Sequence, residues 1–182
     1  MNFFAISGLI NGIAATIFGL FGYLKNRKAL IHKIFGLMNG AVAIWSYGYF
    51  LWLISGEEQT ALFWTRVLAL GATLIPILFL HWIFLLLGIE KEKKFVLIAG
   101  YVATFILAVF SFSPLYVAKV EPALFFKFWP KPGILYHFYI IFIYLGLLGY
   151  GCYQLLLSYK KTSGILRQQI KFVLFGDRKS VV

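Results

Sequence analysis

The sequence has 182 residues, of which 62% are hydrophobic, 20% are aromatic and only 13% are charged. An ordinary soluble domain carries about 25% charged residues, and a soluble protein this apolar would expose patches that lead to aggregation. The composition excludes a soluble globular protein, and because the net charge of +11 lies in short patches between apolar runs, it indicates membrane topology and no nucleic-acid partner.

Five runs contain no Asp, Glu, Lys or Arg, and they cover residues 1–24, 34–56, 67–89, 95–118 and 132–159. A helix that crosses a bilayer needs about 20 predominantly apolar residues, and each run is long enough. Backbone groups in hydrocarbon must be satisfied internally, which favours helices, and none of the runs alternates as the strands of a β-barrel do. We predict an all-α, polytopic transmembrane helix bundle with five complete spans and the start of a sixth. The predicted spans cover about residues 3–24, 34–55, 61–89, 95–113, 134–158 and, in part, 165–176.

The connections between these runs differ in charge. The first, third and fifth connections hold eleven Lys and Arg residues, whereas the second and fourth hold three. The positive-inside rule therefore places the base-rich connections in the cytoplasm and the N-terminus outside. The opening residues MNFFAISGLI carry no basic residue, so we expect a retained span and no cleaved signal peptide.

The third predicted span contains Pro76. Proline removes one backbone donor and should kink the helix, which is tolerated where neighbouring groups satisfy the freed carbonyl. A simple packing bend and a hinge for signalling are both compatible with this residue. Pro76 is therefore the kink or hinge candidate.

The spans offer little chemistry of their own. No acidic residue lies in any of the five runs, although proton-coupled transporters usually place Asp or Glu in the membrane. No phosphate-binding loop, catalytic triad or metal-binding motif is present, and His81 and His137 differ in depth by roughly 20 Å. We expect no metal, no cofactor and no catalytic residue.

The outer half of the predicted bundle gathers aromatic side chains around one cation. The candidate ligand-binding residues are Arg66, Trp52, Tyr49, His137 and Trp129. A concave aromatic site with one cation would suit a small amphipathic or anionic ligand. In the alternative interpretation, Arg66 pairs with a neighbouring glutamate, Glu57 or Glu58, and the aromatic side chains form an interfacial belt.

The last residues depart from the pattern of a spanning helix. The segment GILRQQIKFVLFG begins a sixth span, but DRKSVV at residues 177–182 then places three charges where the bilayer should continue. Each charge would be unfavourable by roughly 2.5–3.5 kcal/mol at the centre of a span. We therefore expect residues 177–182 to be a non-native tail, and residues 1–176 to be one transmembrane domain.

Several segments, taken in order, carry a resemblance to a known family. The first span ends in the basic turn YLKNRKAL, and the second carries the aromatic patch AIWSYGYFLW. The third reads ALFWTRVLALGATLIPILFLHWIF, the outer loop reads SPLYVAKVEPALFFKFWPKPG, and the fifth span leads into LRQQIKFVLFG with an RxQ entry. Over residues 3–176 the sequence resembles the N-terminal seven-transmembrane region of bacterial and archaeal sensor histidine kinases.

This resemblance implies a sensory input module in a prokaryotic plasma membrane, with a small-molecule or lipid-like ligand and homodimerisation through the complete receptor. The chain lacks the family's seventh span and any PAS, dimerisation or kinase segment, so the fragment itself should be catalytically inactive. Similar input regions can precede other outputs, such as a diguanylate cyclase. We expect the signal to pass by a shift of the third or fifth span through the basic stretch Lys160–Lys171. The alternatives are a small transporter or channel subunit, and a membrane enzyme or assembly factor.

Overall fold

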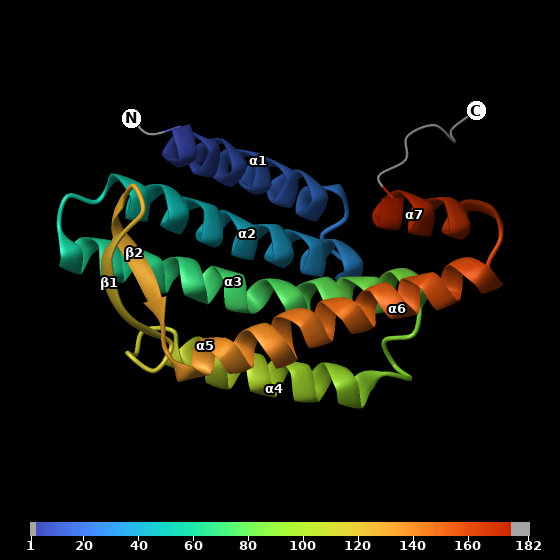
Figure 1. Ribbon diagram of the computed structural model, residues 1–182. Coiled ribbons are helices and arrows are strands. Elements are labelled where there is room, and N and C mark those ends of the chain that lie inside the picture. Colours follow the sequence, from blue (N-terminus) through green and yellow to red (C-terminus); the bar gives the residue numbers. More distant parts are fainter. Residues whose placement is uncertain (1–2, 176–182) are drawn as a thin grey trace.

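The computed structural model describes residues 3–175, and its helices follow the apolar runs (Figure 1). The first four helices are α1 (Phe3–Lys25), α2 (Leu30–Ile54), α3 (Glu58–Leu87) and α4 (Lys94–Phe110). After a hairpin come α5 (Ile134–Phe138), the π-helix η1 (Tyr139–Leu145) and α6 (Gly146–Lys161), which join into one uninterrupted helix. The last helix is α7 (Gly164–Phe175).

Within residues 3–175, four helical segments are long and apolar enough to cross a membrane, namely α1, α2, α3 and the joined helix Ile134–Lys161. Helix α4 is apolar but has only 17 residues, about 26 Å, at the short end of the range for a span. The helices are those of a multi-pass membrane protein. The count of five complete spans and the outside N-terminus stay predictions, and the expected non-native tail at 177–182 lies outside the described residues.

Helix α3 lies at the centre of the bundle, between α2 on one side and α4 and α6 on the other (Figure 1). Its fully buried side chains Ile77, Leu80 and Ile83 form the main core together with Leu155 from α6. Helix α1 packs on α2, away from this core. The centre of α3 is therefore shielded from lipid by several neighbouring helices, whereas α1 is attached at the edge.

The connections alternate between the two ends of the bundle. Figure 1 places the links α1–α2, α3–α4 and α6–α7 at one end, and the N-terminus of α1, the α2–α3 link and the hairpin at the other. The first group comprises the base-rich connections of the sequence. The fold thus separates the basic from the less basic connections, as the charge pattern predicts for a bundle that crosses a membrane.

The hairpin was not predicted, because the sequence was interpreted as an outer loop from about residue 113 to residue 133. Strands β1 (Val117–Ala123) and β2 (Phe126–Pro132) pair antiparallel, with Glu121 opposite Trp129 and Ala123 opposite Phe126. An isolated two-stranded hairpin is marginally stable in water. This hairpin forms because it packs on the ends of α2 and α3, where Val120 lies in a small core with Trp52 and Ala61.

Candidate functional site beneath the hairpin

The hairpin is fastened to α2 by Trp52. This side chain is 5% exposed, and its indole Nε1–H donates a hydrogen bond to the carbonyl of Phe128 in β2. The ring of Trp52 also packs against Trp129 and Tyr49, at centroid distances of 5.8 and 5.5 Å. Together these contacts hold the hairpin against the end of the bundle.

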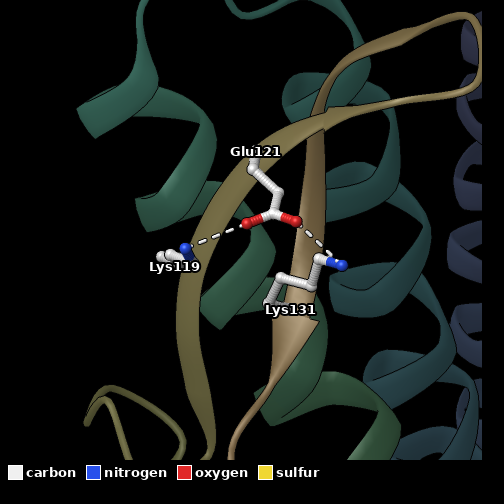
Figure 2. Close-up of polar contacts among 3 residues, drawn as sticks. All are labelled: Lys119, Glu121 and Lys131. Carbon is white, nitrogen blue, oxygen red and sulfur yellow. Dashed lines mark ion pairs between the residues drawn. The ribbon is translucent and has the colours of Figure 1, made fainter.

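The outer surface of the hairpin carries a small ion cluster, shown in Figure 2. The two carboxylate oxygens of Glu121 lie 2.8 Å from Nζ of Lys131 and 3.0 Å from Nζ of Lys119. The hydrogen bonds from Lys131 and Lys119 lower the pKa of the Glu121 carboxyl group. This cluster ties β1 to β2 and neutralises part of the charge of Lys131, which lies at the edge of the cavity described next.

A cavity of about 620 Å³ lies beneath the hairpin, between α2, α3 and the beginning of the helix Ile134–Lys161. This volume is within the range of small-molecule sites, which is about 300–1,000 Å³. Most of the wall is apolar or aromatic. The aromatic side chains that line it are Trp45, Trp129, Tyr116, Tyr136, Tyr139 and Tyr144.

One wall of the cavity is fixed by Tyr116, which directly precedes β1 and is fully buried. The Thr73 hydroxyl donates to the carbonyl of Ala69 at 2.7 Å, so the Tyr116 hydroxyl is the donor in its 2.6 Å bond to Thr73. The connection before the hairpin is thereby attached to the middle of α3.

A second contact in the cavity wall depends on Pro76, the residue expected to kink α3. Helix α3 continues through Pro76, and the carbonyl that its missing N–H would have bonded belongs to Ala72, four residues earlier. The Tyr139 hydroxyl, on η1, donates to this carbonyl at 2.8 Å. A side chain from the fifth predicted span therefore satisfies the group that the proline leaves free, and both Ala72 and Tyr139 line the cavity.

The candidate residues chosen from the sequence are separated by the structure into groups. Trp52 contacts both Tyr49 and Trp129 at the hairpin, and of these three Trp129 lines the cavity. Pro76 is buried in α3 behind the cavity wall. The ligand-binding role of these residues stays a prediction.

Arg66 and His137 lie apart from that group. Arg66 makes no ion pair with Glu57 or Glu58; its Nη2 donates to the carbonyl of Val117 at 3.2 Å, and its buried Nε has no partner among residues 3–175. His137 is exposed, with its ring 6.3 Å from that of Tyr136. Neither side chain forms part of the cavity wall.

The sequence did not indicate that the tyrosines of the cavity lie next to one another. Tyr116 and Tyr136 were not among the candidate residues, whereas in the structure their rings lie 5.9 Å apart and each is about as close to the ring of Tyr139. In the structure, Tyr139, Ile143, Gly151 and Leu155 of the last long span are buried at multiples of four residues, a pattern that the uniformly apolar sequence does not reveal. That spacing departs from the 3.6-residue period of an α-helix.

Comparison with known proteins identifies a family that covers most of the chain. A family described as the N-terminal 7TM region of histidine kinase matches residues 4–177 of the chain. No match was found among curated proteins or among solved structures.

Proposed function

The chain belongs to the family of N-terminal 7TM regions of histidine kinases, and on this premise we propose that it is the sensory input module of a histidine-kinase receptor in a prokaryotic plasma membrane. In this proposal it receives a signal within the bundle and passes it to a cytosolic output domain, and the complete receptor is a homodimer. The module itself contributes recognition and movement, and it carries out no chemical step.

The observation that carries the proposal is the cavity beneath the hairpin. Its wall contains residues of α2, α3, the hairpin and the helix Ile134–Lys161. That helix runs the length of the bundle to the base-rich end, where α7 follows (Figure 1). A molecule in the cavity would therefore contact a continuous element whose far end lies at the base-rich end of the bundle, the end that this proposal assigns to the output domain.

The polarity of the cavity narrows the class of ligand. Among the residues that the structure describes, Lys131 is the one charged residue in the wall, and its ammonium group already bonds the carboxylate of Glu121. A charged ligand would lose its hydration without gaining an unpaired partner of opposite sign, which is unfavourable. We therefore favour a neutral, mainly apolar ligand with a hydrogen-bonding oxygen over the anionic ligand that Arg66 suggested.

The first test is to read the gene downstream of the codon for Phe175. An open reading frame that continues into further spans, a phosphoacceptor helix and an ATP-binding region supports the receptor proposal. A gene that ends after the membrane region contradicts it, and the transporter or channel alternative would then be preferred.

The second test fills the cavity in the complete receptor. Ala72→Phe places a ring in the cavity, and Ala99→Phe is a matched control because Ala99 is exposed on α4. Autophosphorylation in membrane vesicles should change severalfold in the first variant and stay at the parent level in the second. Equal rates in both variants and the parent would show that the cavity is not the input site.

A further inference from the structure

Two irregularities in neighbouring helices meet at the wall of the cavity. In α3, Pro76 leaves the carbonyl of Ala72 without a donor from its own helix. In the last long helix, residues Tyr139–Leu145 form a π-helix, which accommodates an extra residue and is often found at functional sites. The 2.8 Å hydrogen bond from the Tyr139 hydroxyl to Ala72 joins the two irregularities directly.

The π-helical turn determines which side chains face α3. Tyr139 is 3% exposed, and Leu155, in the half of the helix nearer the base-rich end, is fully buried. In an uninterrupted α-helix, two positions 16 residues apart would point about 160° away from each other, at about 100° per residue. One extra residue in the π turn removes most of this difference, so both side chains can face α3 at once.

The two halves of this helix are held differently. The outer half is tied to the segment before the hairpin by backbone hydrogen bonds from Gly133 N–H to Tyr116 O and from Leu135 N–H to Leu115 O, both at 2.9 Å. The inner half contacts its neighbours through side chains, among them the ring of Tyr159, whose centroid lies 4.8 Å from the guanidinium of Arg167 on α7. The joined helix is the least buried of the four candidate spans in the described chain. If the π turn closes into α-helix, the inner half is therefore the part that turns.

We propose that Tyr139 is the positioning residue that couples the cavity to the inner half of this helix. While its hydroxyl is bonded to Ala72, the π turn is held open. When a ligand takes this hydroxyl, the turn closes and Gly146–Lys161 rotates by about one residue, or about 100°. This proposal rests on the proposed function for its signalling meaning, but the movement itself can be tested on the chain alone.

The native cysteine provides a direct measurement of this rotation. Cys152 is the only cysteine in the chain and is exposed on α6, and Phe95, which is 86% exposed on α4, can be replaced by a second cysteine. Spin labels at these two positions report the distance between the helices in lipid nanodiscs. On a helix about 10–12 Å in diameter, a rotation of about 100° displaces a surface group by about 8 Å.

The key variant is Tyr139→Phe, which removes the hydroxyl and keeps the ring. We expect it to shift the labelled distance by several ångströms, and we expect Tyr136→Phe to leave the distance at the parent value, because the Tyr136 hydroxyl makes no hydrogen bond among residues 3–175. A second label pair uses Phe63→Cys and His137→Cys in a Cys152→Ser background. The distance between these two labels should stay unchanged, which would show that the outer half remains folded. An unchanged inner distance, or a changed outer one, overturns the proposal.

The double variant Tyr139→Phe/Pro76→Ala separates coupling from a structural role. Alanine at position 76 restores the N–H that bonds Ala72 within α3, so a tyrosine that only satisfied this carbonyl would no longer be needed. We expect the shifted distance to persist in the double variant, and a return to the parent distance would overturn the coupling role.

If the distances shift but Ala72→Phe leaves autophosphorylation unchanged, the proposed function fails while the movement stands. If autophosphorylation changes but Tyr139→Phe leaves the distance unchanged, the coupling fails alone.

Discussion

Replacing Tyr139 with Phe should destabilise the folded bundle strongly only while residue 76 is proline. In the parent chain, the Tyr139 hydroxyl donates to the carbonyl of Ala72, whose partner within the helix is absent because of Pro76. The phenylalanine ring fills the same space but leaves this carbonyl without a donor. In a Pro76→Ala background the N–H of residue 76 bonds the carbonyl, so the same replacement should have a smaller effect.

The magnitude follows from the environment of the carbonyl. Leaving a buried acceptor unsatisfied costs about 1–3 kcal/mol, and because Ala72 lies in the wall of a cavity and not in the packed core, we expect a value of about 1–2 kcal/mol. Once an alanine at position 76 supplies a donor, only an ordinary second hydrogen bond is lost, worth about 0.5 kcal/mol. The interaction free energy between positions 76 and 139 should therefore be about 1 kcal/mol, within the range measured for residues that share one hydrogen-bond network.

The four proteins of the cycle (parent, each single variant and the double variant) can be compared by unfolding in mixed lipid and detergent micelles with increasing SDS. The free energy of unfolding of each gives the interaction term directly. Equal destabilisation by Tyr139→Phe in the proline and alanine backgrounds would refute the reasoning, since the hydroxyl would then serve some other group than the carbonyl freed by Pro76.

Three further predictions concern the frame of the site. Gly71→Ala places a methyl group 2.5 Å from the α2 backbone and should lower the free energy of unfolding by about 1–3 kcal/mol, whereas Gly40→Ala, which meets nothing within 4 Å, should be neutral or stabilising. Trp52→Phe removes the indole donor to β2 and should speed hydrogen exchange of the hairpin amides about fivefold, which corresponds to a loss of about 1 kcal/mol. Trp64→Phe is the control and should leave this exchange unchanged, because the Trp64 indole makes no hydrogen bond in the described chain. Because the pKa of Glu121 is lowered, its ion cluster stabilises the hairpin fully at pH values above the ordinary carboxyl pKa of about 4.3. This stabilisation is lost as the pH falls through the lowered pKa. Tryptophan fluorescence in acid should show the loss, and Glu121→Gln should abolish this pH dependence.

The helices could be predicted because the bilayer leaves few alternatives. A charge-free run of sufficient length must satisfy its own backbone hydrogen bonds, and this requirement alone favours a helix. Each observed helix overlaps one of the predicted spans, and α7 falls on the start of the sixth. The family could be predicted as well, because the apolar runs and the loops between them occur in a characteristic order.

The hairpin could not be predicted from local signals, which argue against it. Three prolines, at positions 122, 130 and 132, lie in its strands, where proline removes a donor from the ladder. Its two-residue turn contains neither Asn nor Gly, and Leu124 adopts a φ of 53°, which is uncommon for a residue with a branched side chain. The hairpin is determined by its packing on Trp52, which lies far away in the sequence, and by the ion cluster that joins its two strands.

The site itself depends on two helix irregularities lying at the same depth. Pro76 was visible in the sequence, and a neighbouring donor for the freed carbonyl was expected, but the identity of that donor depends on a π turn that no residue preference encodes. A bundle selected only for stability would have avoided both the proline and the π turn, since regular helices satisfy their own backbone groups. Here the hydroxyl of Tyr139 joins both departures from regular structure, and Tyr139 lies in the wall of the aromatic cavity beneath the hairpin. Local irregularities that are retained together, and that satisfy one another, are more readily explained by a requirement for movement than by a requirement for stability.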